Sequence, residues 1–331
     1  MKYGFALFGA GRIGQIHARN LAAHADAQLR HVVDVSAEAA RRLAGASGAQ
    51  VSDARAALAD PAVHAILIAS STDTHAELIQ AGARAGKAVF CEKPLDLDIA
   101  RAEASLAVVA EAKTLLALGF NRRYDPAFRR LQRELAAGRV GNVEVVSITS
   151  RDPSPPPPAY VARSGGLFRD MMIHDLDMAR WLLAEEPVSV YARGSALIDP
   201  AIGAAGDIDT AVVVLETASG RLCQITNSRR CAFGYDQRIE VFGSAGLVRA
   251  DNVPATTVET ADASGFTREP ALPFFLERYA AAYRDELDEF LKALRGEPAQ
   301  LATGSDGRQA LRLADAAQRS LELRAPVSTL D

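Results

Sequence analysis

The sequence has few cysteines, few aromatic residues and no long apolar run. Its 331 residues include 3 Cys and 1 Trp, and aromatic residues make up 6%. Cys91, Cys223 and Cys231 form no CxxC pair, so neither a disulfide framework nor a metal knuckle is expected. The longest apolar runs, such as 65–69 and 114–119, are far shorter than the roughly 20 residues that a membrane span needs. We therefore expect no metal site and no membrane partner.

The chain also has no excess of charge of either sign. It carries 37 Lys and Arg against 41 Asp and Glu, a formal net charge of -4. No basic stripe could neutralise a phosphate backbone, which argues against nucleic acid as a partner. Hydrophobic residues make up 49% and charged residues 24%, as in ordinary globular proteins. Met1 and Lys2 lead directly into the apolar run 3–9, unlike a secretory signal, which predicts a cytoplasmic protein.

The length allows two domains of roughly 150 residues each, or one large barrel. In the first third, short β-rich runs alternate with alanine-rich amphipathic stretches, which predicts βαβ units and a parallel, doubly wound sheet. The strands are expected at 3–8, 29–35, 65–69, 88–91 and 115–118. The helices are expected at 13–25, 37–46, 75–85 and 99–112.

After Gly119 the pattern changes to successive strands joined by short turns, which indicates a mostly antiparallel sheet. These strands are expected at 143–150, 188–192, 210–216, 222–227 and 238–242. Helices are expected at 126–137, 275–294 and 306–323, and the proline-rich run 153–158 is expected to be a stiff, extended loop. The switch favours two domains, 1–120 and 121–331, of which the second is an α+β domain with a large open sheet.

A G-x-G-x-x-G motif occupies residues 9–14, directly after the first predicted strand and at the start of a predicted helix. Gly9 would allow the tight turn, Gly11 the approach of a pyrophosphate to the backbone, and Gly14 the packing of the helix on the strand. Asp34 ends the second strand about 20 residues further on, where an acidic residue accepts hydrogen bonds from a ribose. The context predicts a Rossmann domain for residues 1–120.

Asp34 also predicts which dinucleotide is bound. Its carboxylate can accept hydrogen bonds from the adenosine ribose hydroxyls of NAD, whereas the 2′-phosphate of NADP would place negative charge beside it. Arg41 and Arg42 follow and could in principle serve a phosphate, but they fall within the next predicted helix, where solvated surface charges are common. We therefore expect a preference for NAD.

Two further patterns contain candidate catalytic residues. Lys93 lies in Glu92-Lys93-Pro94 after the strand 88–91, at the edge where open α/β sheets bind ligands, although a lysine at a turn can also be a plain surface residue. Asp170 and His174 are four residues apart, so the carboxylate can hold the imidazole as a general base. A helix-capping aspartate with an unrelated histidine is the alternative.

Together these residues resemble the Gfo/Idh/MocA oxidoreductase family. The resemblance extends over essentially the whole chain. It is carried by the glycine loop, Thr72-Asp73-Thr74-His75, Glu92-Lys93-Pro94, Gly119-Phe120-Asn121-Arg122-Arg123-Tyr124-Asp125, and Asp170 with His174. It implies an N-terminal Rossmann domain followed by a large open sheet, which members often use for dimer or tetramer contacts.

Within that family the sequence is most similar to the inositol 2-dehydrogenase group, on residues 9–20, 120–125 and 235–236. The similarity implies NAD-dependent oxidation of a secondary hydroxyl of a cyclitol, myo-inositol to 2-keto-inositol. Two features depart from the group's pattern: Arg151-Asp152-Pro153 stands where an Arg-Asn-Pro run is frequent, and a polyproline stretch follows it.

The resemblance also assigns roles to residues. The catalytic set is Lys93, Asp170 and His174. The cofactor-binding residues are Gly9, Gly11, Arg12, Ile13, Gly14, Asp34, Ser71, Thr72, His75, Glu92 and Lys93. The substrate-binding residues are Lys93, Arg122, Asp152, Asp170, His174, Tyr235 and Tyr283. Tyr283 also belongs to an aromatic stripe with Phe275, Tyr279 and Phe290, which is more typical of core packing.

Other functions remain open at this point. A scyllo-inositol or aldose dehydrogenase of the same family would share every motif, because hydroxyl stereochemistry is distinguished by small shifts of side chains. A glycosidase would use NAD only for a transient oxidation, and a non-enzymatic regulator would sense NAD without proton-transfer groups. The expected partners are a small polyol or sugar and further copies of the chain, as a dimer or tetramer.

Overall fold

The computed structural model describes residues 2–330, and the chain divides into two compact units. The first unit combines the residues up to Tyr124 with Ala282–Leu311, and the second combines Asp125–Ala281 with the residues from Arg312 onward. The first unit thus ends near the predicted boundary at residue 120. It also contains a late segment, 282–311, that the sequence pattern did not associate with it.

The first unit is built on a six-stranded parallel sheet with the order β3-β2-β1-β4-β5-β6. This is the order of a dinucleotide-binding Rossmann fold. The strands are β1 (Tyr3–Phe8), β2 (Ala27–Val33), β3 (Gln50–Val51), β4 (Ala65–Ile68), β5 (Ala88–Glu92) and β6 (Leu116–Gly119). The helices between them are α1 (Arg12–Ala23), α2 (Ala37–Ser47), α3 (Ala54–Ala59), α4 (His75–Arg84) and α5 (Ile99–Ala112), with short turns η1 (Thr72–Thr74) and η2 (Asn121–Tyr124).

An aromatic cluster explains why segment 282–311 belongs to this unit. Phe5 on β1 and Phe90 on β5 face Phe290, with ring centroids 6.3 and 5.6 Å from it. All three rings are buried, and burying a phenylalanine contributes about 1.5–3 kcal/mol. Helix α11 (Ala280–Leu294) therefore completes the core of a sheet that lies almost 200 residues earlier in the chain.

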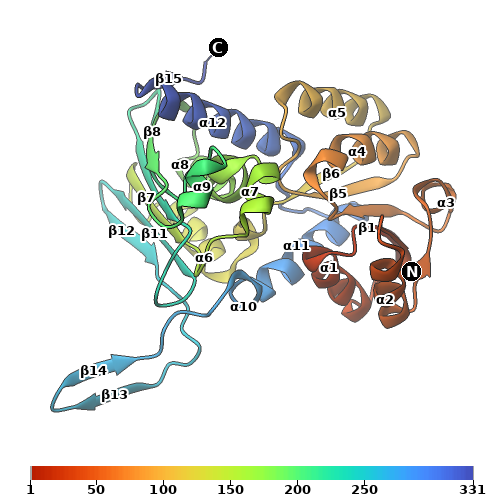
Figure 1. The fold of residues 1–331 in the computed structure, drawn as a ribbon, viewed down its shortest axis with the longest axis horizontal. Helices are drawn as coiled ribbons and strands as arrows, with labels where there is room; N and C mark the ends of the chain where they lie inside the picture. Colours follow the sequence, from red (N-terminus) through yellow and green to blue (C-terminus); the bar gives the residue numbers. More distant parts are fainter. Residues whose placement is uncertain (1, 331) are drawn as a thin grey trace. The chain divides into compact units, whose positions relative to one another are not determined.

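The second unit contains a seven-stranded sheet with the order β12-β11-β7-β10-β9-β8-β15. Only β10 and β7 run parallel, so the prediction of a mostly antiparallel sheet is confirmed. The strands are β7 (Val143–Arg151), β8 (Pro187–Ser195), β9 (Thr210–Thr217), β10 (Leu222–Ser228), β11 (Asp236–Gly243), β12 (Gly246–Ala250) and β15 (Val327–Ser328). The hairpin of β13 (Glu259–Asp262) and β14 (Gly265–Arg268) is separate from this sheet (Figure 1).

The two faces of this sheet have different environments. Val213, Ile225, Ile148 and Ile239 pair across four adjacent strands and are all buried. Helix α8 (Ile173–Leu183) packs against β7 and β10. The alternate positions, such as Val212, are exposed. The remaining helices are α6 (Pro126–Ala136), α7 (Pro158–Ser164), the π-helix η3 (Phe168–Met172), α9 (Pro200–Ala204), α10 (Phe275–Arg278) and α12 (Gly304–Leu323).

The structure differs from the predicted helix 275–294, which is two helices. The chain leaves helical geometry at Tyr279, where φ is -108° and ψ is 15°. The preceding Arg278 forms a buried ion pair with Asp125, and its guanidinium lies 5.1–5.2 Å from the rings of Phe128 and Tyr279. We attribute the break to these contacts, which a periodic apolar pattern cannot reveal. None of the helices in residues 2–330 is long and apolar enough to cross a membrane.

Candidate active site

The glycine loop after β1 is closely packed on two sides and open on the third. A Cβ on Gly9, whose φ is +101°, would lie 2.4 Å from the carbonyl oxygen of Ala69. A Cβ on Gly14 would lie 2.0 Å from the carbonyl oxygen of Gly9, so only glycine lets α1 approach this closely. By contrast, no atom lies within 4 Å of a Cβ on Gly11, the residue that precedes α1. The open side leaves space for a pyrophosphate at the helix N-terminus.

Asp34 lies at the end of β2, beside this loop. Its Oδ2 accepts a hydrogen bond from the Ala10 amide at 2.6 Å, and its Oδ1 accepts one from the Ser36 amide at 2.7 Å. Both bonds fix the carboxylate at the carboxyl edge of the sheet. Of the two arginines that could serve a phosphate, Arg42 pairs with Glu38 on the exposed face of α2, as a surface charge does.

The other predicted cofactor residues follow β4 and begin α1. Ser71 precedes η1 and is exposed, and Thr72 opens that turn. Arg12 and Ile13 form the first turn of α1, the former exposed and the latter half-buried. The carboxyl ends of β1, β2 and β4 thus bring these residues to one edge, which fits a dinucleotide. Their contacts with a cofactor stay predictions.

His75 has a different environment from the exposed candidates. Its ring is buried, with Nδ1 2.8 Å from the carbonyl oxygen of Pro94 and Nε2 3.2 Å from that of Ser70. Burial lowers the pKa of His75, which favours the neutral imidazole. A neutral ring has one N–H, so it donates to one of these two carbonyl oxygens, which follow β4 and β5 at the carboxyl edge.

Lys93 is the residue directly after β5 and is half-buried. The preceding Glu92 points into the core, where its Oε1 lies 2.6 Å from Nε2 of His17. On the following side, the buried Asp96 accepts hydrogen bonds from the Asp98 amide at 2.9 Å and from Arg101 Nε at 3.2 Å. Lys93 therefore sits on a loop whose neighbours are hydrogen-bonded on both sides. The predicted contact of Glu92 with the cofactor stays a prediction.

In the second unit, Asp170 lies in the π-helix η3 and His174 in the first turn of α8. π-helical turns are rare and frequently occur at functional sites. Asp170 Oδ1 accepts a hydrogen bond from the Tyr160 hydroxyl at 2.9 Å, and Oδ2 accepts one from Arg229 Nη1 at 3.3 Å. The two donors hold the carboxylate in one orientation.

Strand register places further candidates near this carboxylate. Arg151 at the end of β7 is paired with Ser228 at the end of β10 and with Asp236 at the start of β11. Asp152, Arg229 and Tyr235, the next residues along, therefore lie at one end of the sheet. Arg229 at this end of the sheet bonds Asp170, so the carboxylate lies at the same end as Asp152 and Tyr235. Tyr160 and Arg229 were missed, because no local spacing links them to Asp170.

The helix that carries His174 is anchored to the sheet by the residue next to it. Asp175 is fully buried, and its Oδ1 accepts a hydrogen bond from Ser150 Oγ at 2.7 Å. Its Oδ2 accepts one from Asn227 Nδ2 at 3.0 Å. These bonds tie the start of α8 to β7 and β10. They thereby fix the backbone position of His174, the residue before Asp175.

Two predicted substrate residues belong to the first unit. Arg122 lies in η2 and is 4% exposed. Tyr283 is also 4% exposed, and its ring centroid lies 5.7 Å from that of His17. Tyr279 and Phe290 of the same stripe are buried as well, as expected of core packing. The substrate contact of Tyr283 stays a prediction.

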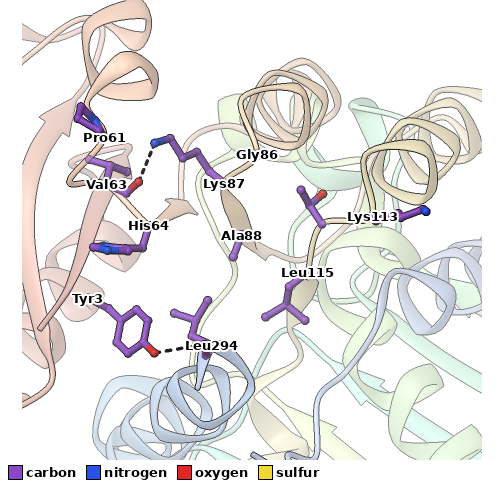
Figure 2. A pocket seen from close by; sticks show the side chains of 11 residues that line it. Tyr3, Pro61, Val63, His64, Gly86, Lys87, Ala88, Lys113, Leu115 and Leu294 are labelled. Atoms are coloured by element: carbon purple, nitrogen blue, oxygen red, sulfur yellow. Dashed lines mark hydrogen bonds between the residues drawn. The ribbon is translucent and has the colours of Figure 1, made fainter. Parts of the chain in front are cut away.

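A hollow of about 490 Å³ lies at the opposite end of the first unit's strands. It is lined by the starts of β1, β4 and β5, among them Tyr3 and Ala88 (Figure 2). Lys87 donates there to the carbonyl oxygen of Val63 at 2.7 Å, and the Tyr3 hydroxyl donates to that of Leu294 at 3.3 Å. Because ligands bind at the carboxyl ends of such strands, this hollow is not the nucleotide site.

Comparisons with known proteins agree with both units. Residues 3–120 match the model of an oxidoreductase family with an NAD-binding Rossmann fold, and residues 128–249 match the Gfo/Idh/MocA C-terminal domain. An inositol 2-dehydrogenase of Rhizobium meliloti (strain 1021) is 51% identical over 98% of each chain.

Solved structures give the same result. The chain resembles a myo-inositol dehydrogenase from Corynebacterium glutamicum, with a TM-score of 0.95 and 41% identity, over 100% of this chain and 99% of that one. It also resembles a scyllo-inositol dehydrogenase from Lactobacillus casei solved with NAD(H) and scyllo-inositol, with a TM-score of 0.93 and 29% identity over 100% of both chains. The predicted fold class, oxidoreductase activity and NAD cofactor are confirmed.

The position of Asp34 generates a prediction about cofactor choice. We expect Asp34→Ser to lower kcat/KM with NAD by about 10- to 100-fold, because a hydrogen bond to a charged group contributes about 1.5–3 kcal/mol. The activity with NADP should fall less or rise, since the repulsive charge is gone. Steady-state kinetics with both cofactors measure the ratio, and Arg42→Ala serves as a control that leaves it unchanged. A parental ratio in Asp34→Ser would contradict the role of Asp34.

Proposed function

Because the chain belongs to the Gfo/Idh/MocA oxidoreductase family, we propose that it oxidises a secondary hydroxyl of a cyclitol, myo-inositol to 2-keto-inositol, with NAD as the oxidant. The observation that carries the proposal is the Asp170 carboxylate, which Tyr160 and Arg229 hold one helical turn before His174. The inositol 2-dehydrogenase that is 51% identical supports the choice of substrate.

The proposed reaction breaks one C–H and one O–H bond of the substrate. The hydride goes to one acceptor and the proton to another. NAD supplies the hydride acceptor when it is bound. His174 takes the hydroxyl proton as general base, and Asp170 orients the imidazole and stabilises its protonated form. Lys93 donates a hydrogen bond to the same oxygen and stabilises the negative charge that develops there. The products are the ketone, NADH and a protonated His174, which balances the hydride and the proton.

A polyhydroxylated ring needs a pocket with many polar groups, since it has little apolar surface to bury. Arg122, Asp152 and Tyr235 supply such groups in the proposed site. The scyllo-inositol dehydrogenase that is 29% identical keeps that cyclitol as the second candidate substrate.

A substrate panel tests the proposed function. The purified chain with NAD is offered myo-inositol, scyllo-inositol, the chiro-inositols and common aldoses in both enantiomers, and NADH is followed by absorbance. We expect the highest kcat/KM with myo-inositol. NADH formation with aldoses alone would show that the substrate is an aldose and not a cyclitol. Glycoside cleavage without net NADH would indicate the glycosidase, and NAD binding without turnover on the whole panel would indicate the sensing regulator.

Removing the proposed base generates a second prediction. We expect His174→Ala to lower kcat by about 100- to 10,000-fold, the usual contribution of general acid–base catalysis. The Kd of NAD should stay near the parental value, because the proposed base does not hold the nucleotide. His24→Ala, whose ring pairs with Asp288 in the first unit, is the matched control and should retain activity. Near-parental turnover of His174→Ala would refute the assignment.

We also propose that the chain forms a homodimer or homotetramer through the exposed face of the seven-stranded sheet. Val212 is 44% exposed on that face, and Phe242 and Leu247, which pair across β11 and β12, are 47% and 52% exposed; exposed apolar pairs of this kind are found at protein interfaces. We expect a Val212→Lys, Val214→Asp double variant to shift the mass by light scattering toward the monomer. Leu197→Lys, also exposed but off the sheet, should not. A monomeric parent would refute the proposal. The cytoplasmic location stays a prediction.

A further inference from the structure

A cluster of three ionisable side chains lies buried in the core of the first unit. His17 comes from α1, Glu92 from the end of β5 and Glu286 from α11. Their exposed fractions are 1%, 9% and 0%. One ring nitrogen or carboxylate oxygen of each lies within 4.8 Å of the others. Two acidic groups this close in a dry core require an explanation, because burying an unpaired charge costs several kcal/mol.

The contacts of the cluster indicate how its charge is limited. His17 Nε2 lies 2.6 Å from Glu92 Oε1, which is a short hydrogen bond between the imidazole and the carboxylate. Neither oxygen of Glu286 has a hydrogen-bond partner among residues 2–330. Burial raises the pKa of Glu286 well above its ordinary value, and the nearby Glu92 adds to the rise. Glu286 is therefore the neutral carboxyl, and Glu92 with His17 is the polar pair.

The pair connects two parts of the proposed site. Helix α1, which carries His17, begins at the glycine loop, where its N-terminus would face the pyrophosphate of a bound NAD. Glu92 is the last residue of β5 and Lys93 is bonded directly to it. A Glu92 side chain held in the core therefore sets the direction in which Lys93 leaves the strand. From the other side, His75 holds the carbonyl of Pro94.

The packing around His17 and Glu92 restricts the conformations of both side chains. The His17 ring lies edge-on to Phe90 at 5.4 Å and to Tyr283 at 5.7 Å. A Cβ on Gly119 would lie 2.8 Å from Glu92 Oε2, so a larger residue at that point of β6 would displace the carboxylate from its present position. These contacts restrict both rotamers, and the hydrogen bond between the two side chains is preorganised.

We propose that His17 and Glu92 are positioning residues for Lys93, which tie the helix at the glycine loop to the loop that carries the proposed catalytic lysine, with Glu286 as their buried neighbour. The inference rests on the proposed function, because it gives Lys93 a catalytic role. A metal ion held by the same three residues is the alternative occupant of the cluster.

The test compares glutamine substitutions at three buried glutamates. Glu92→Gln keeps the shape but weakens the charged hydrogen bond to His17, so we expect kcat to fall about 10- to 100-fold. The Kd of NAD should change by less than about threefold, since the glycine loop is intact and the Glu92 side chain points into the core, away from its predicted contact with the cofactor. Glu286→Gln should lower kcat much less than Glu92→Gln does, because an amide replaces a carboxyl that is already neutral. The matched control, Glu289→Gln on the same helix, alters a glutamate that bonds Lys292 and the Gln300 amide instead.

Three outcomes would overturn the inference. Parental kcat in Glu92→Gln would show that the pair does not position Lys93. Equal losses in Glu92→Gln and Glu286→Gln would contradict the division into a polar pair and a neutral carboxyl. One equivalent of metal in the purified chain by mass spectrometry, lost from either variant, would indicate the metal site instead.

A second measurement does not depend on turnover and separates the inference from the proposed function. Amide hydrogen exchange at residues 92–96 should be faster in Glu92→Gln than in the parent and unchanged in Glu289→Gln. An infrared band of a protonated carboxyl should be present in the parent and absent from Glu286→Gln. If the parent oxidises no member of the panel, the proposed function fails. Unchanged exchange in Glu92→Gln overturns the positioning role in either case.

Discussion

The arrangement of the first unit depends on one close approach, that of α1 to the end of β1. A Cβ on residue 14 would lie 2.0 Å from the Gly9 carbonyl oxygen, so this packing exists only because residue 14 is glycine. With the helix in this position its N-terminus faces the carboxyl edge of the sheet, and the Ala10 amide reaches Asp34. The same placement brings His17, one turn into the helix, to Glu92. The nucleotide loop and the support of Lys93 thus share one steric cause.

In the second unit, a buried charged side chain fixes the geometry of the proposed site. Arg229 is 1% exposed, and its guanidinium bonds Asp170 and lies 3.8 Å from Asp207. Ion pairs in a dry core contribute little net stability, because desolvation offsets most of the Coulomb attraction. Their effect is geometric: a guanidinium has donors in fixed directions, so it orients the carboxylate it bonds. Stability comes instead from apolar rows such as Val213 with Ile225.

Local patterns in the sequence were sufficient for the features that depend on neighbouring residues. The glycine loop, Asp34, the alternation of strands and helices, and the spacing of Asp170 and His174 are all short-range. The features that were missed join residues far apart in the chain. Arg229 is 59 residues from Asp170, and Glu92 is 75 from His17. Segment 282–311 returns to the first sheet because Phe290 fits between Phe5 and Phe90, which no periodicity records.

The two kinds of residue in the proposed site also differ in how they are held. The groups assigned to proton transfer are held by hydrogen bonds to other elements. Tyr160 and Arg229 bond Asp170, and the buried Asp175 anchors the start of α8, which carries His174. Asp152 lies elsewhere, at the end of β7 before the proline-rich stretch, where its amide donates to the carbonyl oxygen of Ser228 at 2.9 Å. In the proposed site, the groups assigned to proton transfer therefore lie on elements anchored in the core, whereas Asp152 lies at a strand end.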